Sequence, residues 1–303
     1  MRITKVFNNS VVLGVDAQGA ERVLLGPGVG FRARPGDTVR WELVDKTFVP
    51  SGTTPPERLV RLLEEIPPED LALAGRVLDG VQDVLAPGAA EHVLLPLADH
   101  ISFALRRARE GVDEIEYPLQ WEVLTLYPTE VALARTALGT IEAERGVRLP
   151  DQEAVALALH FVNAQLGAGD MTRTVRITRV LTEIMDLIHQ TLGVQVDETS
   201  VPAARFVAHL RYLVVRQQEG RSAAIPEEAM AAVLREARPR EYDCAVRIAA
   251  LLADRFGWPV DRFEVLYLAL HVSRLVAEAR GGEDGAPADG GGVADGADAG
   301  ADE

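Results

Sequence analysis

Four histidines occupy matching positions in two stretches of the sequence, and imidazole is a side chain that does chemistry near pH 7. His100 and His209 each precede a branched aliphatic residue, and an aromatic residue follows two places further on. A second histidine, directly after a leucine, comes 60 residues later at His160 and 62 residues later at His271. Because chance rarely places histidine at four corresponding points, the spacing predicts a domain-length repeat with two functional histidines in each copy.

Phosphoryl transfer is one of the chemistries that these histidines could carry. Neutral imidazole is a good nucleophile that accepts a phosphoryl group in line, and the product adds about 1.5 to 2 negative charges. Arginines such as Arg106, Arg107 or Arg211 would hold these charges, whereas an acidic surface across a dimer interface would repel them. The modification can therefore switch a contact in either direction, depending on what faces it.

A metal site, a nucleophilic enzyme and a purely structural role are the alternatives. Metal-binding histidines recur at short spacing on one element, and only the Asp99-His100 pair hints at such a site. No Gly-x-Ser-x-Gly motif occurs, and Cys244 lies in an apolar helical segment, where core packing is the better interpretation. His92 and His189 have no duplicated partners, so no role is assigned to them.

Helical periodicity dominates the part of the chain that carries the histidines. The pattern predicts two all-α helical bundles, over residues 69–168 and 171–281, after a proline-rich linker at 50–68. Asp261 is expected to cap the helix of the second bundle that carries His271. Thr129 and Asp151 are expected to cap two successive helices of the first bundle. Gly146 is expected to end the first of those two helices.

The first 54 residues have a different pattern, with short alternating segments separated by turn residues. We expect strands over residues 2–7, 11–15, 21–25 and 44–49, which would form a small antiparallel sheet. The fold class is therefore multidomain, a small β-sheet domain followed by two all-α bundles. A domain of this size is marginal alone, so dimerisation would add useful burial.

A glycine-rich loop at residues 26–31 is the most distinctive feature of this first domain. It is not a dinucleotide loop, because Pro35-Gly36 would stop the helix whose N-terminus must meet the phosphates. An exposed Phe31 beside Arg32 and Arg34 would suit stacking on unpaired bases, with nearby asparagines reading base edges. The alternative is that Phe31 packs in the core.

Charge and composition bound the remaining possibilities. Residues 1–54 carry a net charge of +2 within a chain of −15, so the mildly basic head sits on a strongly acidic body. The single cysteine excludes an internal disulfide and fits a cytoplasmic protein. No signal peptide and no apolar run long enough to cross a membrane are recognised. Residues 282–303 are mainly Gly, Ala and Asp and are expected to be disordered.

The residues of the head carry a resemblance to a known family. Lys5-Val6-Phe7-Asn8-Asn9, Leu25-Gly26-x-Gly28-x-x-Phe31 and Lys46-Thr47-Phe48 resemble the co-antiterminator RNA-binding domain. That domain heads the BglG/SacY/LicT family of transcriptional antiterminators, which continues with two PTS regulation domains of two regulatory histidines each. The family usually has Asn where Ser10 stands, and a basic or small residue where Pro27 stands.

The resemblance implies a sugar-responsive antiterminator that binds a leader-RNA hairpin as a homodimer, and not an enzyme. The phosphorylation sites that it implies are His100, His160, His209 and His271. The RNA-binding residues that it implies are Lys5, Asn8, Asn9, Ser10, Gly26, Gly28, Phe31 and Arg32. The phosphoryl donors would be HPr and a sugar-specific permease of the phosphotransferase system, with no cofactor, no metal and no membrane insertion.

Two alternatives belong to other functional classes. One is a DNA-binding activator with similar regulatory domains, which would need a helix-turn-helix that the strand-rich head does not supply. The other is a histidine-dependent metal enzyme, which would require stoichiometric metal bound through residues such as His100 and His160.

Overall fold

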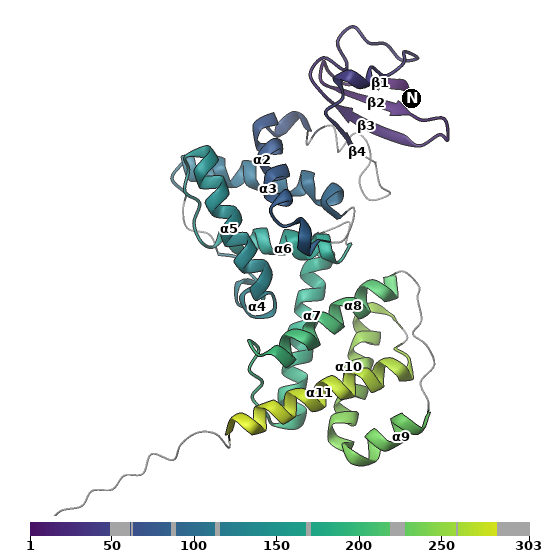
Figure 1. Cartoon of the computed structure of the whole chain (residues 1–303), viewed down its shortest axis with the longest axis vertical. Coiled ribbons are helices and arrows are strands. Elements are labelled where there is room, and N and C mark those ends of the chain that lie inside the picture. The colour runs from purple at the N-terminus through teal and green to yellow at the C-terminus, as the bar shows by residue number, and fades with distance from the viewer. Residues whose placement is uncertain are drawn as a thin grey trace, which may run out of the picture. The chain divides into compact units, whose positions relative to one another are not determined.

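The chain divides into two compact units in this computed structural model (Figure 1). One unit comprises Met1–Glu183 and Val207–Ser222, and the other comprises Ile184–Phe206 and Ala223–Glu303. The structure describes residues 1–48, 61, 63–85, 89–112, 116–167, 171–218, 228–258 and 260–283. The predicted linker falls largely on residues outside this description, and the predicted tail lies outside it from residue 284 onwards.

The head is a four-stranded antiparallel sheet in the order β1-β2-β3-β4, which confirms the predicted fold class of this region. The strands are β1 Arg2–Val6, β2 Val11–Val15, β3 Glu21–Leu25 and β4 Lys46–Phe48. Of the expected strand at 44–49, β4 covers residues 46–48. It starts later than predicted because Val44 still closes the 3-10 helix η1 Trp41–Leu43, its N–H donating to the Trp41 carbonyl, and residue 49 lies outside the described residues. Thus the sheet is a meander whose loops join neighbouring strands.

One apolar cluster holds this sheet together. Ile3, Val12 and Leu24 from three adjacent strands pack with Val29 and Val39 from the long connection between β3 and β4. All five side chains are buried. The period of two along a strand places such residues on one face, so the connection between β3 and β4 folds over that face and covers it.

The remainder of the described chain is helical. The first unit holds α2 Pro68–Asp79, η2 Gln82–Val84, α3 Ala89–Arg109, α4 Gln120–Leu126, α5 Pro128–Arg145 and α6 Glu153–Gln165. After these come α7 Met171–Leu192, α8 Val201–Gln218, α9 Glu228–Ala237, α10 Pro239–Phe256 and α11 Arg262–Glu283. The first two of the three division points fall inside α7 and α8, the third falls outside the described residues, and α9, α10 and α11 belong to the second unit. Predominantly helical structure after the sheet is as predicted.

Helix α6 is the central element of the first bundle (Figure 1). Every residue from Glu153 to Ala164 is buried, and the helix contacts α3, α4 and α5. A helix that is apolar all round can only be stable when neighbours surround it, which fits the run of alanine, valine and leucine in this segment. His160 and Glu153 are the polar exceptions that matter below.

The predicted helix ends are partly right. The Asp261 carboxylate accepts the Glu264 backbone N–H at 2.9 Å, and Gly146 ends α5 with φ of 63°, both as expected. The caps at Thr129 and Asp151 are wrong. Helix α5 already begins at Pro128, whose missing N–H costs nothing at a first helical position, and the Asp151 carboxylate instead pairs with Arg135 at 3.2 Å.

Candidate functional site

The carboxylate of Glu153 is the centre of a polar network inside the first bundle. Glu153 stands at the start of α6, and its Oε2 lies 2.9 Å from His100 Nε2 on α3. The Tyr117 hydroxyl donates a hydrogen bond to the same oxygen at 2.7 Å, and the Arg107 guanidinium donates to Oε1. The Glu153 side chain is only 1% exposed, so three donors replace the water that it would otherwise bind.

The electrostatics of this network keep Glu153 ionised. Burial by itself raises the pKa of Glu153, but the hydrogen bonds from His100 and Tyr117 and the charge of Arg107 outweigh it and lower the pKa. Burial and the bond to Glu153 raise the pKa of Tyr117, so its hydroxyl stays protonated and remains a donor. The first turn of a helix also favours a negative charge. The network is therefore a stable buried anion with three donors.

His160 lies beside His100 but in a different environment. The two rings are 5.4 Å apart between centroids and tilted by 45°, and His160 is 8% exposed. Burial, and then the charge of His100, lowers the pKa of His160 to about 3. Its Nδ1 atom is buried without a hydrogen-bond partner. His160 is thus a neutral imidazole throughout the physiological range, packed on the central helix.

The second predicted pair is less deeply buried. His209 on α8 and His271 on α11 both retain partial exposure. The ring of His271 lies 6.0 Å from that of Phe206, centroid to centroid. Burial, and then the charge of Arg274, lowers the pKa of His271. His209 falls in the first compact unit and His271 in the second.

The residues around the first pair recur at the same offsets around the second. Glu153 precedes His160 by seven residues, and the buried Glu264 precedes His271 by seven. Arg107 follows His100 by seven residues, and Arg216 follows His209 by seven. Each arginine lies over the aromatic residue of its own helix, Arg107 at 5.0 Å from the Phe103 centroid and Arg216 at 5.8 Å from that of Tyr212. The repeat therefore includes a glutamate and an arginine as well as the histidines.

Sequence reasoning missed Glu153 and Tyr117. The paired offsets of seven residues could have revealed Glu153, whereas nothing local marks Tyr117, which the fold brings to the carboxylate from 36 residues away. The sequence predicted that Arg107 could pair with a phosphoryl group, and in the structure it already pairs with the Glu153 carboxylate. Arg211 pairs with Glu130 at 2.9 Å, and Arg106 is exposed.

Two residues set aside at first have structural roles. His189 Nδ1 lies 2.8 Å from the Val194 carbonyl, where it stabilises the chain leaving α7. Cys244 is fully buried, and burial raises its pKa to about 11, so it stays a thiol in the core as expected. Within the described residues, no three His, Cys, Asp or Glu side chains are placed to hold a metal ion.

Apart from Lys5 in β1, the proposed RNA-binding residues lie on two loops of the head that are hydrogen-bonded to each other. The Gly26 N–H donates to the Ser10 carbonyl at 2.9 Å, and the Gly30 N–H donates to the Asn9 carbonyl at 3.0 Å. The Asn8 side chain accepts the Ser10 N–H at 2.8 Å, which closes the first turn. The turn at 8–10 and the loop at 26–31 therefore form one composite surface.

The glycines of this loop are required by close backbone approach. A Cβ on Gly26 would stand 1.8 Å from the Leu43 carbonyl oxygen, and one on Gly30 would stand 2.0 Å from that of Asn8. Gly28 has φ of +79°, which side chains rarely adopt. The glycine pattern thus has a structural cause, and any role of Gly26 and Gly28 in binding is through the backbone.

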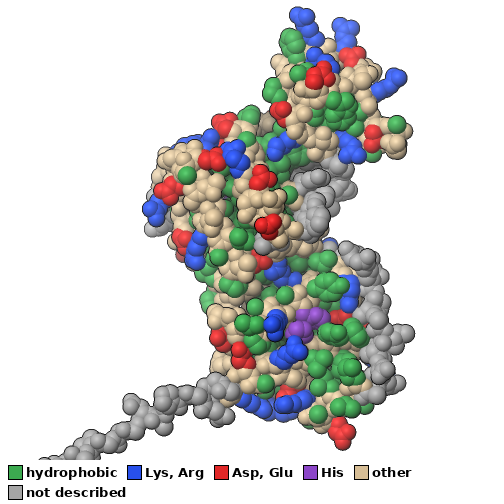
Figure 2. Space-filling view, viewed as in Figure 1, with side chains coloured by type: hydrophobic (Ala, Val, Ile, Leu, Met, Phe, Trp, Pro, Cys, Tyr) green, Lys and Arg blue, Asp and Glu red, His purple; other side chains and the backbone are tan. Residues whose placement is uncertain are grey.

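Phe31 is 52% exposed, so the core-packing alternative for it is excluded. The Arg32 guanidinium lies over its ring at 5.3 Å, and Arg32 itself has φ of 57°. The Arg40 guanidinium donates to the carbonyls of Gly28 at 2.9 Å and Phe31 at 3.0 Å, which fixes the loop. Arg40 and its neighbour Trp41, 51% exposed, were missed by sequence reasoning. Lys and Arg side chains project from this domain in Figure 2.

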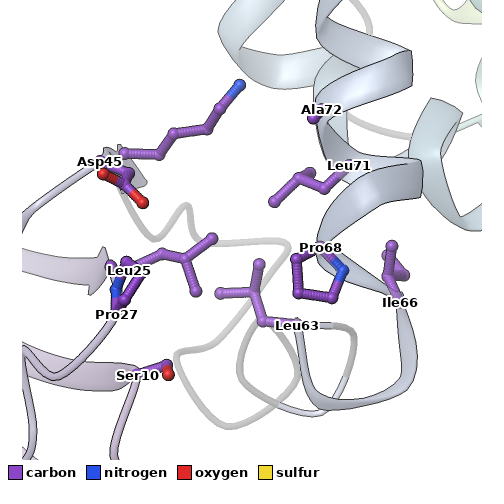
Figure 3. Close-up of a pocket in the computed structure, with 11 residues that line it drawn as sticks. Ser10, Leu25, Pro27, Asp45, Leu63, Ile66, Pro68, Leu71 and Ala72 are labelled. Atoms are coloured by element: carbon purple, nitrogen blue, oxygen red, sulfur yellow. The ribbon is translucent and has the colours of Figure 1, made fainter.

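Not all of the predicted residues share this open surface. Asn9 is exposed and Lys5 lies over the Phe7 ring at 4.8 Å, but the Asn8 amide donates to Glu64 at 3.1 Å. Ser10 and Gly26 line an apolar pocket of about 190 Å³ (Figure 3). Its other lining residues are Leu25, Pro27, Asp45, Lys46, Leu63, Ile66, Pro68, Leu71 and Ala72.

Comparisons with known proteins identify these parts. The chain matches the CAT RNA binding domain over residues 1–54 and the PRD domain over residues 86–164 and 182–275. It is 37% identical to the beta-glucoside operon antiterminator of Dickeya chrysanthemi, covering 92% of this chain and 98% of the relative. The chain belongs to the CAT–PRD family of transcription antiterminators.

Two further antiterminators are similar to this chain, one over nearly all of it and one over about half of it. Transcription antiterminator LicT of Bacillus subtilis (strain 168) is 31% identical over 92% of this chain and 100% of its own length. The crystal structure of GlcT CAT-PRDI is 27% identical with a TM-score of 0.42, covering 54% of this chain and 97% of that one. These antiterminators are regulators that bind RNA, and the sheet domain with its exposed loop is the CAT domain.

The family places the histidines in the regulatory part of the molecule. His100 and His160 fall in the first PRD match, and His209 and His271 fall in the second. Among the described residues, no helix is both long enough and apolar enough to cross a membrane.

Proposed function

We propose that this antiterminator binds an imperfect hairpin in a leader transcript as a homodimer, and that histidine phosphorylation by the phosphotransferase system controls it. Binding stabilises one RNA fold by its binding free energy and so prevents an overlapping terminator from forming. The observation that carries the regulatory part is the duplicated arrangement of histidine, glutamate and arginine at equal offsets. A sensor in which each domain takes up phosphate would use such a repeat.

The RNA contact is proposed to centre on Phe31, Arg32 and Asn9. The exposed ring supplies a stacking platform, the adjacent guanidinium supplies charge, and the asparagine amide supplies paired donors and acceptors. Lys5, Asn8, Ser10, Gly26 and Gly28 are proposed to shape and extend this surface. Because Ser10 and Pro27 depart from the family pattern, the preferred hairpin loop is proposed to differ from that of relatives.

The phosphoryl donors are proposed to be HPr and a sugar-specific permease, acting on His100, His160, His209 and His271 in the cytoplasm. The domains are proposed to span 1–54, 69–168 and 171–281. Phosphorylation of the first PRD is expected to inhibit RNA binding, because new negative charge would meet an acidic body.

Phe31→Ala tests the RNA contact directly. Loss of one stacked base costs about 1 to 3 kcal/mol, so the affinity of the full chain for a bulged hairpin should fall roughly 5- to 150-fold. Fluorescence anisotropy against a salt series, beside duplex DNA of equal length, is the measurement. Trp121→Ala is the matched control, because Trp121 is an exposed aromatic on α4 in the helical part of the first unit. Equal affinity for hairpin and duplex DNA would contradict the proposal.

A further inference from the structure

The network around Glu153 determines more than the position of His100, since it also determines which ring nitrogen can react. An ionised carboxylate accepts hydrogen bonds and donates none. The Arg107 guanidinium and the Tyr117 hydroxyl can only donate to Glu153, and the pKa of Glu153 lies below its ordinary value. The His100 Nε2 atom, 2.9 Å from Glu153 Oε2, must therefore carry the hydrogen and donate it. In neutral His100 the lone pair then lies on Nδ1.

We propose that Glu153 is a positioning residue that fixes the Nε2–H tautomer of His100, so that the phosphoryl group enters on Nδ1 of this histidine and not on Nε2. The proposal deepens the proposed function and rests on it for the identity of the donor. Glu153 does not touch the reacting phosphorus. It acts through the imidazole, as a buried carboxylate orients a catalytic histidine in other sites.

The chemical step balances with a phosphohistidine protein as donor. The His100 Nδ1 lone pair attacks the phosphorus and forms a new N–P bond. The N–P bond to the donor breaks, and its electron pair returns to the donor imidazole. The His100 ring becomes positively charged while Nε2–H stays on the ring, and the adjacent Glu153 carboxylate balances that charge. No other proton needs to move during transfer.

The remaining members of the network hold the carboxylate itself. Arg107 donates to Oε1, and Tyr117 donates to Oε2 alongside His100. These contacts come from the end of α3 and from the segment after it, while Glu153 begins the fully buried helix α6. Glu153 can therefore neither rotate away nor take up a proton without leaving buried donors unsatisfied.

His160 provides an internal contrast. Its Nδ1 is buried and without a hydrogen-bond partner, so that nitrogen is closed to a protein donor in this fold. The His100 side chain is 17% exposed and so remains within reach of solvent. The two histidines of the pair are consequently not equivalent acceptors, although their rings are neighbours. His100 is the one that reacts without opening of the bundle.

The first test measures the tautomer in the unmodified full chain. Long-range proton–nitrogen correlation NMR on protein labelled with ¹⁵N-histidine distinguishes a protonated from an unprotonated ring nitrogen. The His100 signal, assigned by its loss in His100→Asn, should show protonated Nε2 and unprotonated Nδ1 near pH 8. A predominantly Nδ1–H tautomer would overturn the proposal, and the tautomer itself is measured on the wild-type chain.

The second test measures where and how fast the phosphoryl group enters. Phosphorylation by phospho-HPr, and separately by potassium phosphoramidate, is followed by ³¹P–¹H NMR, which tells phosphorus on Nδ1 from phosphorus on Nε2. Wild type should carry it on Nδ1 of His100. Glu153→Gln should mix the two tautomers of His100 and slow phosphoryl transfer at least about tenfold. Hydrogen-bond partners that orient a functional histidine typically contribute a factor of this size to its activity.

Two variants separate positioning from a merely structural effect. Asp151→Asn changes an exposed carboxylate outside the network and should leave both the tautomer and the Nδ1 product unchanged, and Glu153→Asp should partly restore the rate lost in Glu153→Gln. Phosphorus on Nε2 of His100 in wild type would overturn the proposal. Reaction at Nδ1 with phosphoramidate but none with phospho-HPr would instead contradict the proposed donor and leave the role of Glu153 intact.

Discussion

The two histidine pairs share their spacing but differ in burial. His160 is 8% exposed with its pKa lowered to about 3, whereas His271, at the equivalent point of the repeat, stays partly exposed. Both follow a buried glutamate by seven residues. Periodicity fixes which face of a helix carries a residue, but the neighbouring helices decide how much water reaches it. Equivalent positions of the repeat can thus hold a histidine that is buried away from solvent, His160, and one that solvent can reach, His271.

This difference suggests how two similar domains can respond differently to one donor. In the first PRD, His100 is presented with a fixed tautomer and His160 is enclosed behind it. In the second, the segment that would correspond to Tyr117, at residue 226, lies outside the described residues. Changes to the buried network of the first pair should therefore cost more stability than changes at exposed positions.

The largest effect is expected from Glu153→Ala. The change leaves the Arg107 guanidinium, the Tyr117 hydroxyl and His100 Nε2 without their acceptor, and breaking a buried ion pair costs about 3 to 5 kcal/mol. Urea unfolding followed by circular dichroism measures the loss of stability. Asp151→Ala is the control, because the exposed pair of Asp151 with Arg135 should contribute little. Equal losses of unfolding free energy in Glu153→Ala and Asp151→Ala would show that the buried network contributes no more to stability than the exposed ion pair does.

A smaller effect is expected from acid. The unfolded chain protonates His160 near its ordinary pKa of 6.5, but the folded chain does so only near 3. The unfolded state therefore binds the extra proton, and stability should fall by about 1.4 kcal/mol for each pH unit below 6.5. Glu153, whose folded pKa is also lowered, adds loss in the same direction only below about its ordinary 4.5.

Urea unfolding between pH 6.5 and 5 measures this loss while the paired carboxylates remain ionised, and the variant His160→Leu separates the contribution of His160 from that of His271, whose pKa is also lowered. His160→Leu keeps an apolar volume and removes the titrating group, so its stability should depend less on pH than that of wild type. NMR should show no protonation of His160 down to pH 5, while His271, with a smaller depression, serves as the internal comparison. A His160 that titrates near pH 6 would contradict its assigned burial.

The smallest effects are expected at the two aromatic residues beneath the arginines. Phe103→Leu and Tyr212→Leu each remove one cation–π contact at an exposed site, which is worth about 0.5 to 1 kcal/mol. The two losses of unfolding free energy should be similar, because the contacts are equivalent in the repeat. A large loss at only one of them would mean that the two arginines are held differently.

The sheet was predictable from the sequence because its determinants are local. Strands β2 and β3 agree with their predicted ranges, since turn residues such as Asn8 and Gly19 mark both ends. The exposure of Phe31 was not decided by the sequence, because an aromatic after a glycine loop can face either way. Only the bonds from Arg40 to the loop carbonyls, across 9 and 12 residues, settle it.

The histidine positions were also visible in the sequence, whereas their environment was not. Glu153 contacts His100 from 53 residues away and Arg107 from 46, so the repeat could mark Glu153 as a candidate but could not show which side chains it contacts. The prediction that Asp151 caps α6 was wrong for the same reason. Its side chain could have capped the helix, but it forms an ion pair with Arg135 on α5. Tertiary contacts decided both cases.

One measurement tests the central claim that the histidines of the first PRD control the RNA-binding head. The full chain, with and without phospho-HPr treatment, is titrated with the leader hairpin, and the matched variant His100→Ala is treated in the same way. We expect phosphorylation to weaken hairpin binding of the wild type and to leave the affinity of His100→Ala nearly unchanged. Equal hairpin affinity of phosphorylated and unmodified wild type, with phosphate shown on His100, would contradict the account.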